Sequence, residues 1–310
     1  MNRGIKTLLL GTLLLAGQKA LANCAVTAGS VNLGSVTSSS IYSTPAQAQG
    51  TGGLNCSGIG LTLLTQNTVS VKIVSTTNNM FLTDTGGSGD QIPYLIYPDA
   101  NYQYPFSAGQ TINYNSLNLI SLIFVSSNVS IPLYIQTTVG ANVRAGTYTD
   151  TINLSWTYSI CYAGILGACL AWTGTNVAGT VSVTAVITKS CLINTANNVN
   201  FGSMALVGQF NPINQSITLT CTKTLPYNSY FTNGNNPITG WRQMLSGTSN
   251  FLQYQIYLPN TSTVWSSTNA QSGTGTGLAQ SIPFTAAINP AQTEVPVGTY
   301  QDNVSYVVTY

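Results

Sequence analysis

The sequence contains no histidine and few charges: eight Lys or Arg and six Asp or Glu make up 5% of its 310 residues. Without histidine there is no Ser-His or Cys-His pair to activate a nucleophile. Clustered Lys and Arg, which nucleic-acid binding needs, are also missing. Asp84 and Asp90 flank a glycine-rich turn too poor in oxygen ligands for a calcium loop. The composition predicts no enzyme, no cofactor, no metal site and no nucleic-acid partner.

The first 22 residues have the pattern of a signal peptide, with cleavage expected after Ala22. Arg3 and Lys6 precede the apolar run LLLGTLLLAG, and a small-residue ALA site follows. About ten apolar residues fall short of the ~20 that a membrane span needs. Removing this segment takes away three of the eight basic residues and no acid, leaving five basic and six acidic residues. We expect an exported, nearly uncharged mature chain that does not insert into the membrane.

Two halves of the chain share a series of motifs in the same order. VNLGS, LNCS, SIPLYIQ and GTYTDTINLSWTY in the first half return as VNFGS, LTCT, SIPFTAA and GTYQDNVSYVVTY in the second. The run NVAGTVSVTAVIT (176–188) follows the first GTY segment, whereas Tyr310 closes both the second segment and the sequence. The repeat predicts two homologous domains, 23–188 and 189–310, of which the second lacks its last strand.

The six cysteines of an exported chain predict three disulfides. The repeat places two pairs at matching positions and leaves the third closing a short loop in the first domain. The expected pairs are Cys24–Cys56, Cys191–Cys221 and Cys161–Cys169. Zinc is the competing interpretation, and the absence of His and of any CxxC pair disfavours it.

Short alternating runs rich in Thr, Ser, Val, Ile and Tyr, separated by Gly, Asn and Pro, are typical of β-strands. We predict an all-β protein of two immunoglobulin-like antiparallel sandwiches, the C-terminal one incomplete. In 176–188 the apolar residues share one face, and Gly179 shares it too, which suits a narrow groove. We expect this strand to close the first domain as its edge, although an ordinary linker strand has the same pattern. Its apolar face consists of Val177, Val181, Val183, Ala185 and Ile187.

The second half carries RQM (242–244), YQIY (254–257), VW (264–265) and the GTY-x-D segment in that order. This pattern resembles the spore coat protein U domain, the pilin module of archaic (Csu-type) chaperone–usher pili. The first half matches more loosely, with YLIY at 94–97 and its own GTYTD. The resemblance implies a sandwich without strand G. A periplasmic chaperone first lends a strand to it, and the next pilin subunit, assembled at the outer-membrane usher, then replaces that strand.

In such pili, shaft subunits carry a donor extension before the first cysteine. Cleavage after Ala22 would leave only Asn23 before Cys24. The resemblance then implies a subunit that accepts a strand and gives none, the two-domain tip adhesin at the cell surface. A secreted structural coat protein, or a tip that only initiates assembly, is the alternative.

Three apolar stretches of the first domain form a hypothetical adhesive surface of exposed loops for attachment and biofilm formation. They lie after Cys56, at 117–123, and within the disulfide-closed CYAGILGAC loop. Core strands, or a hairpin folded against its own domain, would have the same sequence pattern. A glycan-binding lectin is a further alternative, with Asp99, Asn101 and Tyr102 as its residues. The hypothetical adhesive residues are Ile59, Leu61, Leu63, Leu64, Leu117, Leu119, Ile120, Leu122, Ile165 and Leu166.

Overall fold

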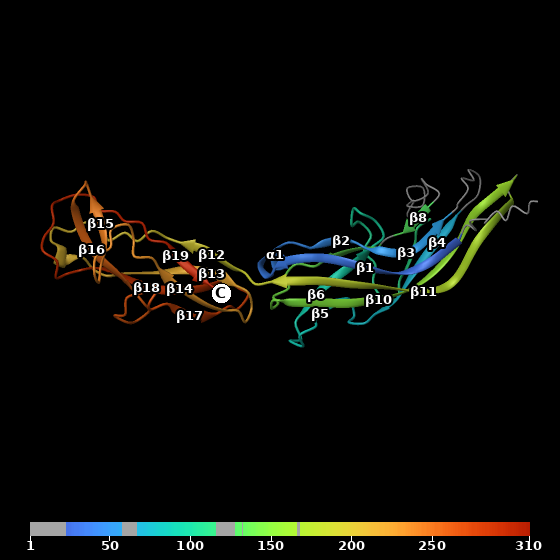
Figure 1. Ribbon diagram of the computed structural model, residues 1–310, viewed down its shortest axis with the longest axis horizontal. Helices are drawn as coiled ribbons and strands as arrows, with labels where there is room; N and C mark the ends of the chain where they lie inside the picture. Colours follow the sequence, from blue (N-terminus) through green and yellow to red (C-terminus); the bar gives the residue numbers. More distant parts are fainter. Residues whose placement is uncertain (1–22, 58–66, 116–127, 132, 166–167) are drawn as a thin grey trace, which may run out of the picture.

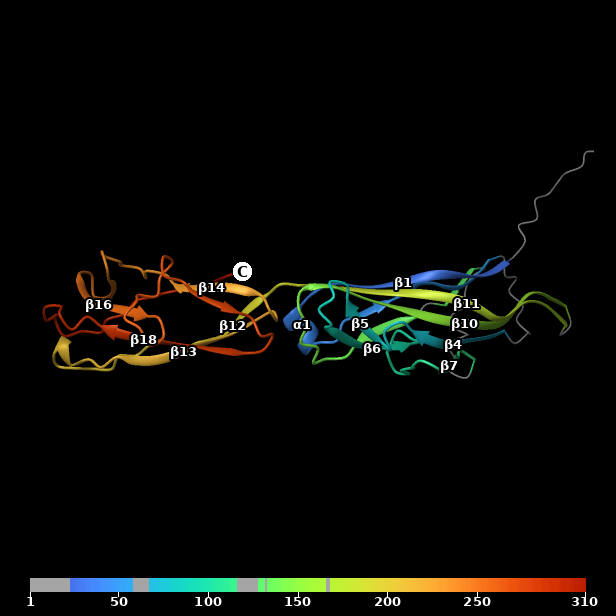
Figure 2. The same ribbon diagram turned by 90° about the horizontal axis from the view of Figure 1, so that it is seen from below.

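The structure, a computed structural model, describes residues 23–57, 67–115, 128–131, 133–165 and 168–310. These residues are almost entirely β-strand, with one short helix, α1 (Ser38–Ser43), and one 3-10 turn, η1 (Val207–Gln209). None of the described helices is long and apolar enough to cross a membrane. The strands form two groups that lie end to end in an elongated molecule (Figures 1 and 2). We call β1–β11 domain 1 and β12–β19 domain 2.

Domain 1 is one sheet that curls around its own core. Alternation builds its strands: in β4, Val69, Val71 and Ile73 are buried and the residues between them are not. The pairing order is β2-β9-β6-β5-β10-β11-β1-β3-β8, with β4 on β10 and β7 on β4. The strands are β1 (Asn23–Thr37), β2 (Gln47–Gln49), β3 (Thr51–Ser57), β4 (Thr68–Thr76), β5 (Phe81–Asp84), β6 (Gln91–Tyr97), β7 (Thr111–Asn113), β8 (Asn128–Ile131), β9 (Tyr134–Thr137), β10 (Gly146–Ile165) and β11 (Ala168–Thr188).

β11 completes domain 1, but as an interior strand and not as the edge that the sequence suggested. It runs antiparallel to β10 and parallel to β1, so both of its edges are hydrogen-bonded. The inward side chains Val181, Val183, Ala185 and Ile187 are at most 4% exposed, and Val177 packs against the same core. Alternation in the sequence shows which face is apolar, whereas the number of partner strands depends on contacts with β1, more than 140 residues away.

Domain 2 repeats this plan with two smaller sheets. One has the order β12-β13-β18-β16-β15 and the other β17-β14-β19. Its buried side chains form two clusters, whereas the buried residues of domain 1 form one continuous core. The strands are β12 (Cys191–Ala196), β13 (Ile213–Cys221), β14 (Pro226–Phe231), β15 (Arg242–Ser246), β16 (Asn250–Tyr257), β17 (Gln271–Thr274), β18 (Gln280–Ile288) and β19 (Tyr306–Thr309).

The three disulfides follow the pairing that the repeat predicts. Cys24–Cys56 and Cys191–Cys221 join residues that face each other on paired strands, β1 with β3 and β12 with β13. Cys161–Cys169 ties β10 to β11 close to the end of their long hairpin. Each domain is an immunoglobulin-like sandwich, and in each the first strand is covalently fixed to its neighbour.

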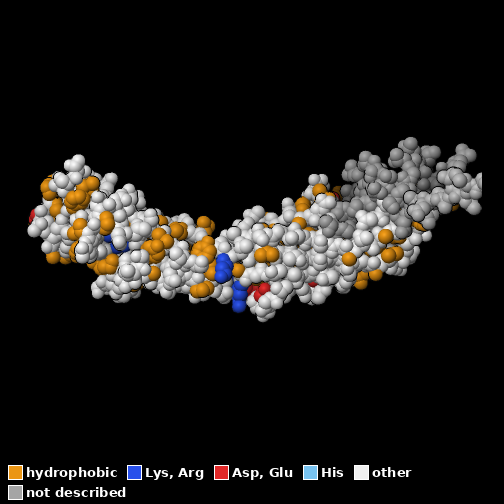
Figure 3. Space-filling view, in the orientation of Figure 1, with side chains coloured by type: hydrophobic (Ala, Val, Ile, Leu, Met, Phe, Trp, Pro, Cys, Tyr) orange, Lys and Arg blue, Asp and Glu red, His pale blue; other side chains and the backbone are white. Residues whose placement is uncertain are grey.

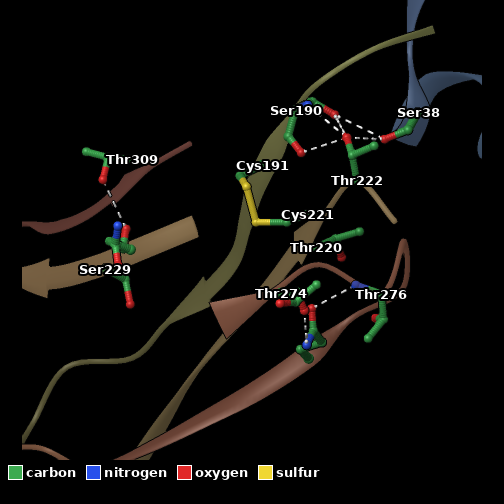
Figure 4. Close-up of a disulfide and its surroundings, with 12 residues drawn as sticks. Ser38, Ser190, Cys191, Thr220, Cys221, Thr222, Ser229, Thr274, Thr276 and Thr309 are labelled. Atoms are coloured by element: carbon green, nitrogen blue, oxygen red, sulfur yellow. Dashed lines mark hydrogen bonds between the residues drawn. A yellow bond between two sulfur atoms is a disulfide. The ribbon is translucent and has the colours of Figure 1, made fainter. Parts of the chain in front are cut away.

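The two domains meet through polar groups, which we call the joint. Figure 3 shows blue and red side chains gathered there on an otherwise nearly uncharged surface. The Lys223 ammonium of domain 2 donates to Asp90 Oδ1 of domain 1 at 2.6 Å, and within domain 1 the backbone NH of Arg144 donates to Asp90 Oδ2 at 2.9 Å. Beside the Cys191–Cys221 disulfide, the hydroxyl of Ser38 from α1 hydrogen-bonds that of Thr222 at 2.7 Å (Figure 4).

Candidate functional site

The GTY-x-D segments carry the same hydrogen bonds in both domains. Asp150 accepts from the hydroxyl of Tyr94 at 2.8 Å, and Asp302 accepts from that of Tyr254 at 2.8 Å. The other carboxylate oxygen of each Asp accepts backbone NH groups from a loop and from the next residue. Burial and the partner carboxylate raise the pKa of both tyrosines. These acids hold the segment in place, as their repeat positions indicated.

The tyrosine of each GTY segment also makes a matched contact. The hydroxyl of Tyr148 donates to the carbonyl of Arg144 at 2.9 Å, and that of Tyr300 donates to the carbonyl of Pro296 at 2.6 Å. Each spans four residues, the arrangement of a tyrosine corner in immunoglobulin-like sandwiches. The tyrosine that recurs in both GTY segments is the sequence signal of this corner, although none of the sequence-based predictions assigns it a role. The two segments can therefore be superposed residue by residue.

This superposition exposes one difference, which we call the seam of domain 2. In domain 1, β11 lies between β10 and β1. In domain 2, β19 pairs with β14 on one side and β12 with β13 on one side, and among the described residues no strand occupies their other edges. Residues of both strands, Cys191 and Tyr306 among them, nevertheless pack on one small cluster. The seam is the position that β11 fills in domain 1.

Side chains along β19 are less buried than their counterparts in domain 1. Ile152, Leu154 and Trp156 of domain 1 are fully buried, whereas their counterparts Val304, Tyr306 and Val308 are only half-buried. Tyr158 is 8% exposed and its counterpart Tyr310 is 59% exposed. The strand itself is also shorter in domain 2: β10 begins at Gly146, the first residue of its GTY segment, whereas β19 begins only at Tyr306. A half-buried apolar edge with free backbone groups is a surface for strand addition.

The opposite wall of the seam behaves in the same way. Val31 and Leu33, buried beside β11, correspond to Val199 and Phe201, which are only half-buried against the larger cluster of domain 2. Leu192 and Ile193 of β12 are 52% and 40% exposed. Both walls of the seam therefore carry apolar side chains that are partly or largely exposed to solvent.

Beneath the seam lies an aromatic floor held by a buried arginine. Phe231 packs edge-on against Trp265 and tilted against Tyr306, with ring centroids 5.1 Å away in both cases. Arg242, 1% exposed, donates to the carbonyls of Phe231, Thr232 and Trp265 and to the side chain of Gln255. Burial lowers the pKa of its guanidinium and burial raises the pKa of Tyr306 to about 12. The RQM, YQIY and VW motifs therefore meet in one network.

The predicted adhesive residues fall mostly outside the described residues: Ile59, Leu61, Leu63, Leu64, Leu117, Leu119, Ile120, Leu122 and Leu166. For Ile165 the structure describes the backbone, which pairs with that of Ala168.

The described residues beside these segments come together. The NH of Cys161 donates to Asn67 Oδ1 at 2.8 Å, and Asn115 Nδ2 donates to the Asn67 carbonyl at 2.6 Å. Ser57 pairs with Asn128. The described flanks of all three apolar stretches therefore lie toward one end of the domain, where the β10–β11 hairpin projects away from domain 2 (Figures 1 and 2).

The residues of the glycan alternative form a compact turn. Asp99 is 7% exposed, and its Oδ1 accepts the NH of Asn101 at 2.9 Å. Tyr102 has a positive φ of 54° and lies edge-on to Tyr97 and Tyr134, with centroids 5.3 and 6.1 Å away. Asp99 thus serves its own backbone turn.

Asp84 likewise caps its own loop. It accepts backbone NH groups of Gly86 and Ser88, and the hydrogen bond from the Ser88 side chain, followed by that from Gly86, lowers the pKa of this carboxyl. Within the described ranges, no three His, Cys, Asp or Glu residues gather where they could hold a metal ion.

Comparison with solved structures gives matches to subunits and chaperone complexes of pili. The CsuC–CsuE chaperone–tip adhesion subunit pre-assembly complex, from archaic chaperone–usher Csu pili of Acinetobacter baumannii, matches at 25% identity and a TM-score of 0.66. The match covers 93% of this chain and 100% of that one. The P pilus rod subunit PapA matches at 14% identity and a TM-score of 0.32, covering 39% of this chain and 98% of that one.

A CFA/I chaperone–tip adhesin complex matches at 13% identity and a TM-score of 0.30, over 78% of this chain and 83% of that one. No curated protein matches the sequence. The family model of the Spore Coat Protein U domain matches residues 10–155 and again residues 177–307. Both halves carry the motifs and hydrogen bonds described above, and the chain belongs to the Spore Coat Protein U domain family.

Proposed function

We propose that the chain is the tip subunit of a chaperone–usher pilus. Domain 2 joins the fibre by accepting a strand into its seam, and domain 1 attaches the fibre to surfaces and supports biofilm formation. A periplasmic chaperone would first occupy the seam, and the next pilin would replace it at the outer-membrane usher. The mature protein would reach the cell surface at the pilus tip.

The seam carries the first half of this proposal. The same family of domains occurs twice in one chain, and β11 shows how the missing strand would sit: parallel to the first strand and antiparallel to the last. Fully burying each aliphatic side chain of such a strand contributes ~1.5–3 kcal/mol. The likeness to the Csu chaperone–tip adhesion complex supports a chaperone as the first occupant.

A self-complemented fusion tests strand acceptance. A copy of residues 176–188 is joined behind Tyr310 through an Asn-Gly turn, which would let it return antiparallel along β19. We expect a soluble monomer whose domain 2 unfolds at higher urea than that of the parent chain. The matched control carries the same copy with Asn at the positions of Val181, Val183 and Ile187. Equal unfolding midpoints for all three proteins would contradict strand acceptance.

The clustering of loop flanks supports the second half of the proposal. Asn67 hydrogen-bonds both Cys161 and Asn115, so described residues that flank the three apolar stretches lie close together. The Cys161–Cys169 disulfide removes roughly 2–3 kcal/mol of unfolded-state entropy from so short a loop. A closed, uncharged hairpin end is suited to contact with apolar surfaces, since it adds no charge that must be desolvated.

Substitution at the hairpin end tests adhesion separately from assembly. We expect Ile165→Asn with Leu166→Asn to abolish attachment to hydrophobic plastic while fibres still assemble. Val139→Asn, at a 52% exposed valine elsewhere in domain 1, is the control and should attach normally. Attachment should also persist at about 1 M salt, where charges more than ~3 Å apart are screened. Attachment by the double variant, or binding confined to particular glycans on an array, would refute the apolar mechanism.

A further inference from the structure

Domain 1 contains a filled copy of the seam, in which one position of the inserted strand is too crowded for any side chain. A Cβ atom on Gly179 would lie 2.7 Å from Val26 Cγ1 and 3.2 Å from Trp156 Nε1. Real Cβ atoms do not approach other heavy atoms within 3.0 Å. Any side chain at this point of β11 would have to displace the valine on one side and press on the indole on the other, so the position favours glycine.

The corresponding walls of domain 2 can be identified from register. The GTY segments align without a gap, so Val308 stands where domain 1 has Trp156. Pairing agrees, because Leu154 faces Ile73 of β4 while Tyr306 faces Phe231 of β14. On the other wall, Val26 faces Leu54 and Ile193 faces Leu219, so Ile193 stands where domain 1 has Val26.

The replacement of Trp156 by Val308 and of Val26 by Ile193 removes the crowding at this position of the seam. Val308 has no indole ring, and Ile193, although one carbon larger than Val26, is 40% exposed and has room to turn aside. The half-buried Tyr306 and Val308 would then border an unfilled space beside a glycine. An empty apolar space forfeits the contacts that a side chain would make there.

We infer that the strand accepted by domain 2 carries an aliphatic side chain, Val or Leu in size, where β11 carries Gly179. The inference rests on the strand acceptance proposed above and specifies the chemistry of the partner. It predicts that the seam discriminates between donor strands at this position.

The other end of the seam supplies a contrast within the same strand. Ala185, fully buried, pairs with Tyr148, next to Asp150. Domain 2 keeps both wall residues, as Tyr300 and Asp302, with the same hydrogen bonds to Pro296 and Tyr254. Because this wall keeps the same tyrosine and aspartate with the same hydrogen bonds, the accepted strand should keep a small residue opposite Tyr300.

Peptide dissociation from the full, disulfide-bonded chain tests the inference. The parent peptide copies residues 176–188, with a lysine tail for solubility. A second copy carries Gly179→Val and a third Ala185→Leu, and their dissociation is followed from a fluorescent label. Filling the space with one aliphatic side chain should slow dissociation about tenfold, and the Ala185→Leu copy should leave at least about tenfold faster than the parent. In the variant chain Val308→Trp, which restores the indole, the peptide with glycine should dissociate more slowly than the peptide with valine.

The outcomes separate the two proposals. If none of the peptides binds, strand acceptance itself fails, and the inference fails with it. If they bind and the glycine peptide dissociates as slowly as the valine peptide from the unaltered chain, strand acceptance stands and the inference is overturned.

Discussion

At the scale of single residues, Arg242 shows how one side chain organises the floor of the seam. Within the part of the chain that the structure describes, its guanidinium hydrogen-bonds no carboxylate and donates to three carbonyls and one amide oxygen. Those carbonyls belong to Phe231, Thr232 and Trp265, so the arginine fixes the end of β14 and the aromatic residues at once. The sequence marks the position through its motif but not its burial, because arginine is rarely fully buried unless its donors are all paired.

Arg242→Met should therefore destabilise domain 2 although methionine suits a core. Each buried carbonyl left without a donor costs about 1–3 kcal/mol, and three would lose theirs, so we expect a loss of at least ~3 kcal/mol. Urea unfolding of the self-complemented fusion measures it. Lys72→Met, at an exposed lysine of β4, is the control and should change stability by less than ~0.5 kcal/mol. A loss no larger than that of the control would mean that water replaces the arginine.

At the scale of elements, the comparison of β11 with the seam is the central observation. The repeat predicts the disulfides and the inward face of 176–188, because each depends on local alternation or on matched order. It does not predict that β11 is interior, or that β19 is shorter than β10, because both depend on partners distant in sequence. For apolar runs such as 117–123, alternation cannot separate a core strand from an exposed loop, since both are aliphatic.

The crowding at Gly179 gives a prediction about this element. Gly179→Val should force Val26 and the Trp156 indole out of position and destabilise domain 1 by about 1–3 kcal/mol, the cost of overpacking a core. Ser182→Val, on the exposed face of the same strand, introduces the same side chain without the clash and should be nearly neutral. Intrinsic tryptophan fluorescence during urea unfolding reports both. Equal midpoints for the two variants would show that Val26 and Trp156 move aside to admit a side chain. The basis for size selection at this position would then be lost.

At the scale of the whole molecule, the joint lies between the seam of domain 2 and the end of domain 1 from which the β10–β11 hairpin projects. Thr222 follows Cys221 of the disulfide that fixes β12, and its hydroxyl contacts Ser38 of α1 and the backbone of Ser190 (Figure 4). Asp90, which the sequence presents only as one side of a glycine-rich turn, accepts from Lys223 across the boundary. Its role was not predictable, because its partner lies 133 residues away. The joint would transmit force along the fibre axis to domain 1.

Weakening the joint should loosen the domain arrangement without unfolding either domain. Asp90→Asn removes the charge that faces Lys223, and Ser38→Val removes the buried hydroxyl pair with Thr222. The ammonium is one-third exposed, so the ion pair is screened and contributes at most about 1 kcal/mol, and high salt should mimic its loss. We expect small-angle scattering to report a broader distribution of domain orientations for the double variant, with unchanged unfolding midpoints. Asp84→Asn, at the other side of the same turn, where the carboxylate accepts the NH groups of Gly86 and Ser88, should leave the distribution narrow. If the double variant scatters like the parent chain, the short linker alone sets the orientation, and the polar contacts of the joint are a consequence of it.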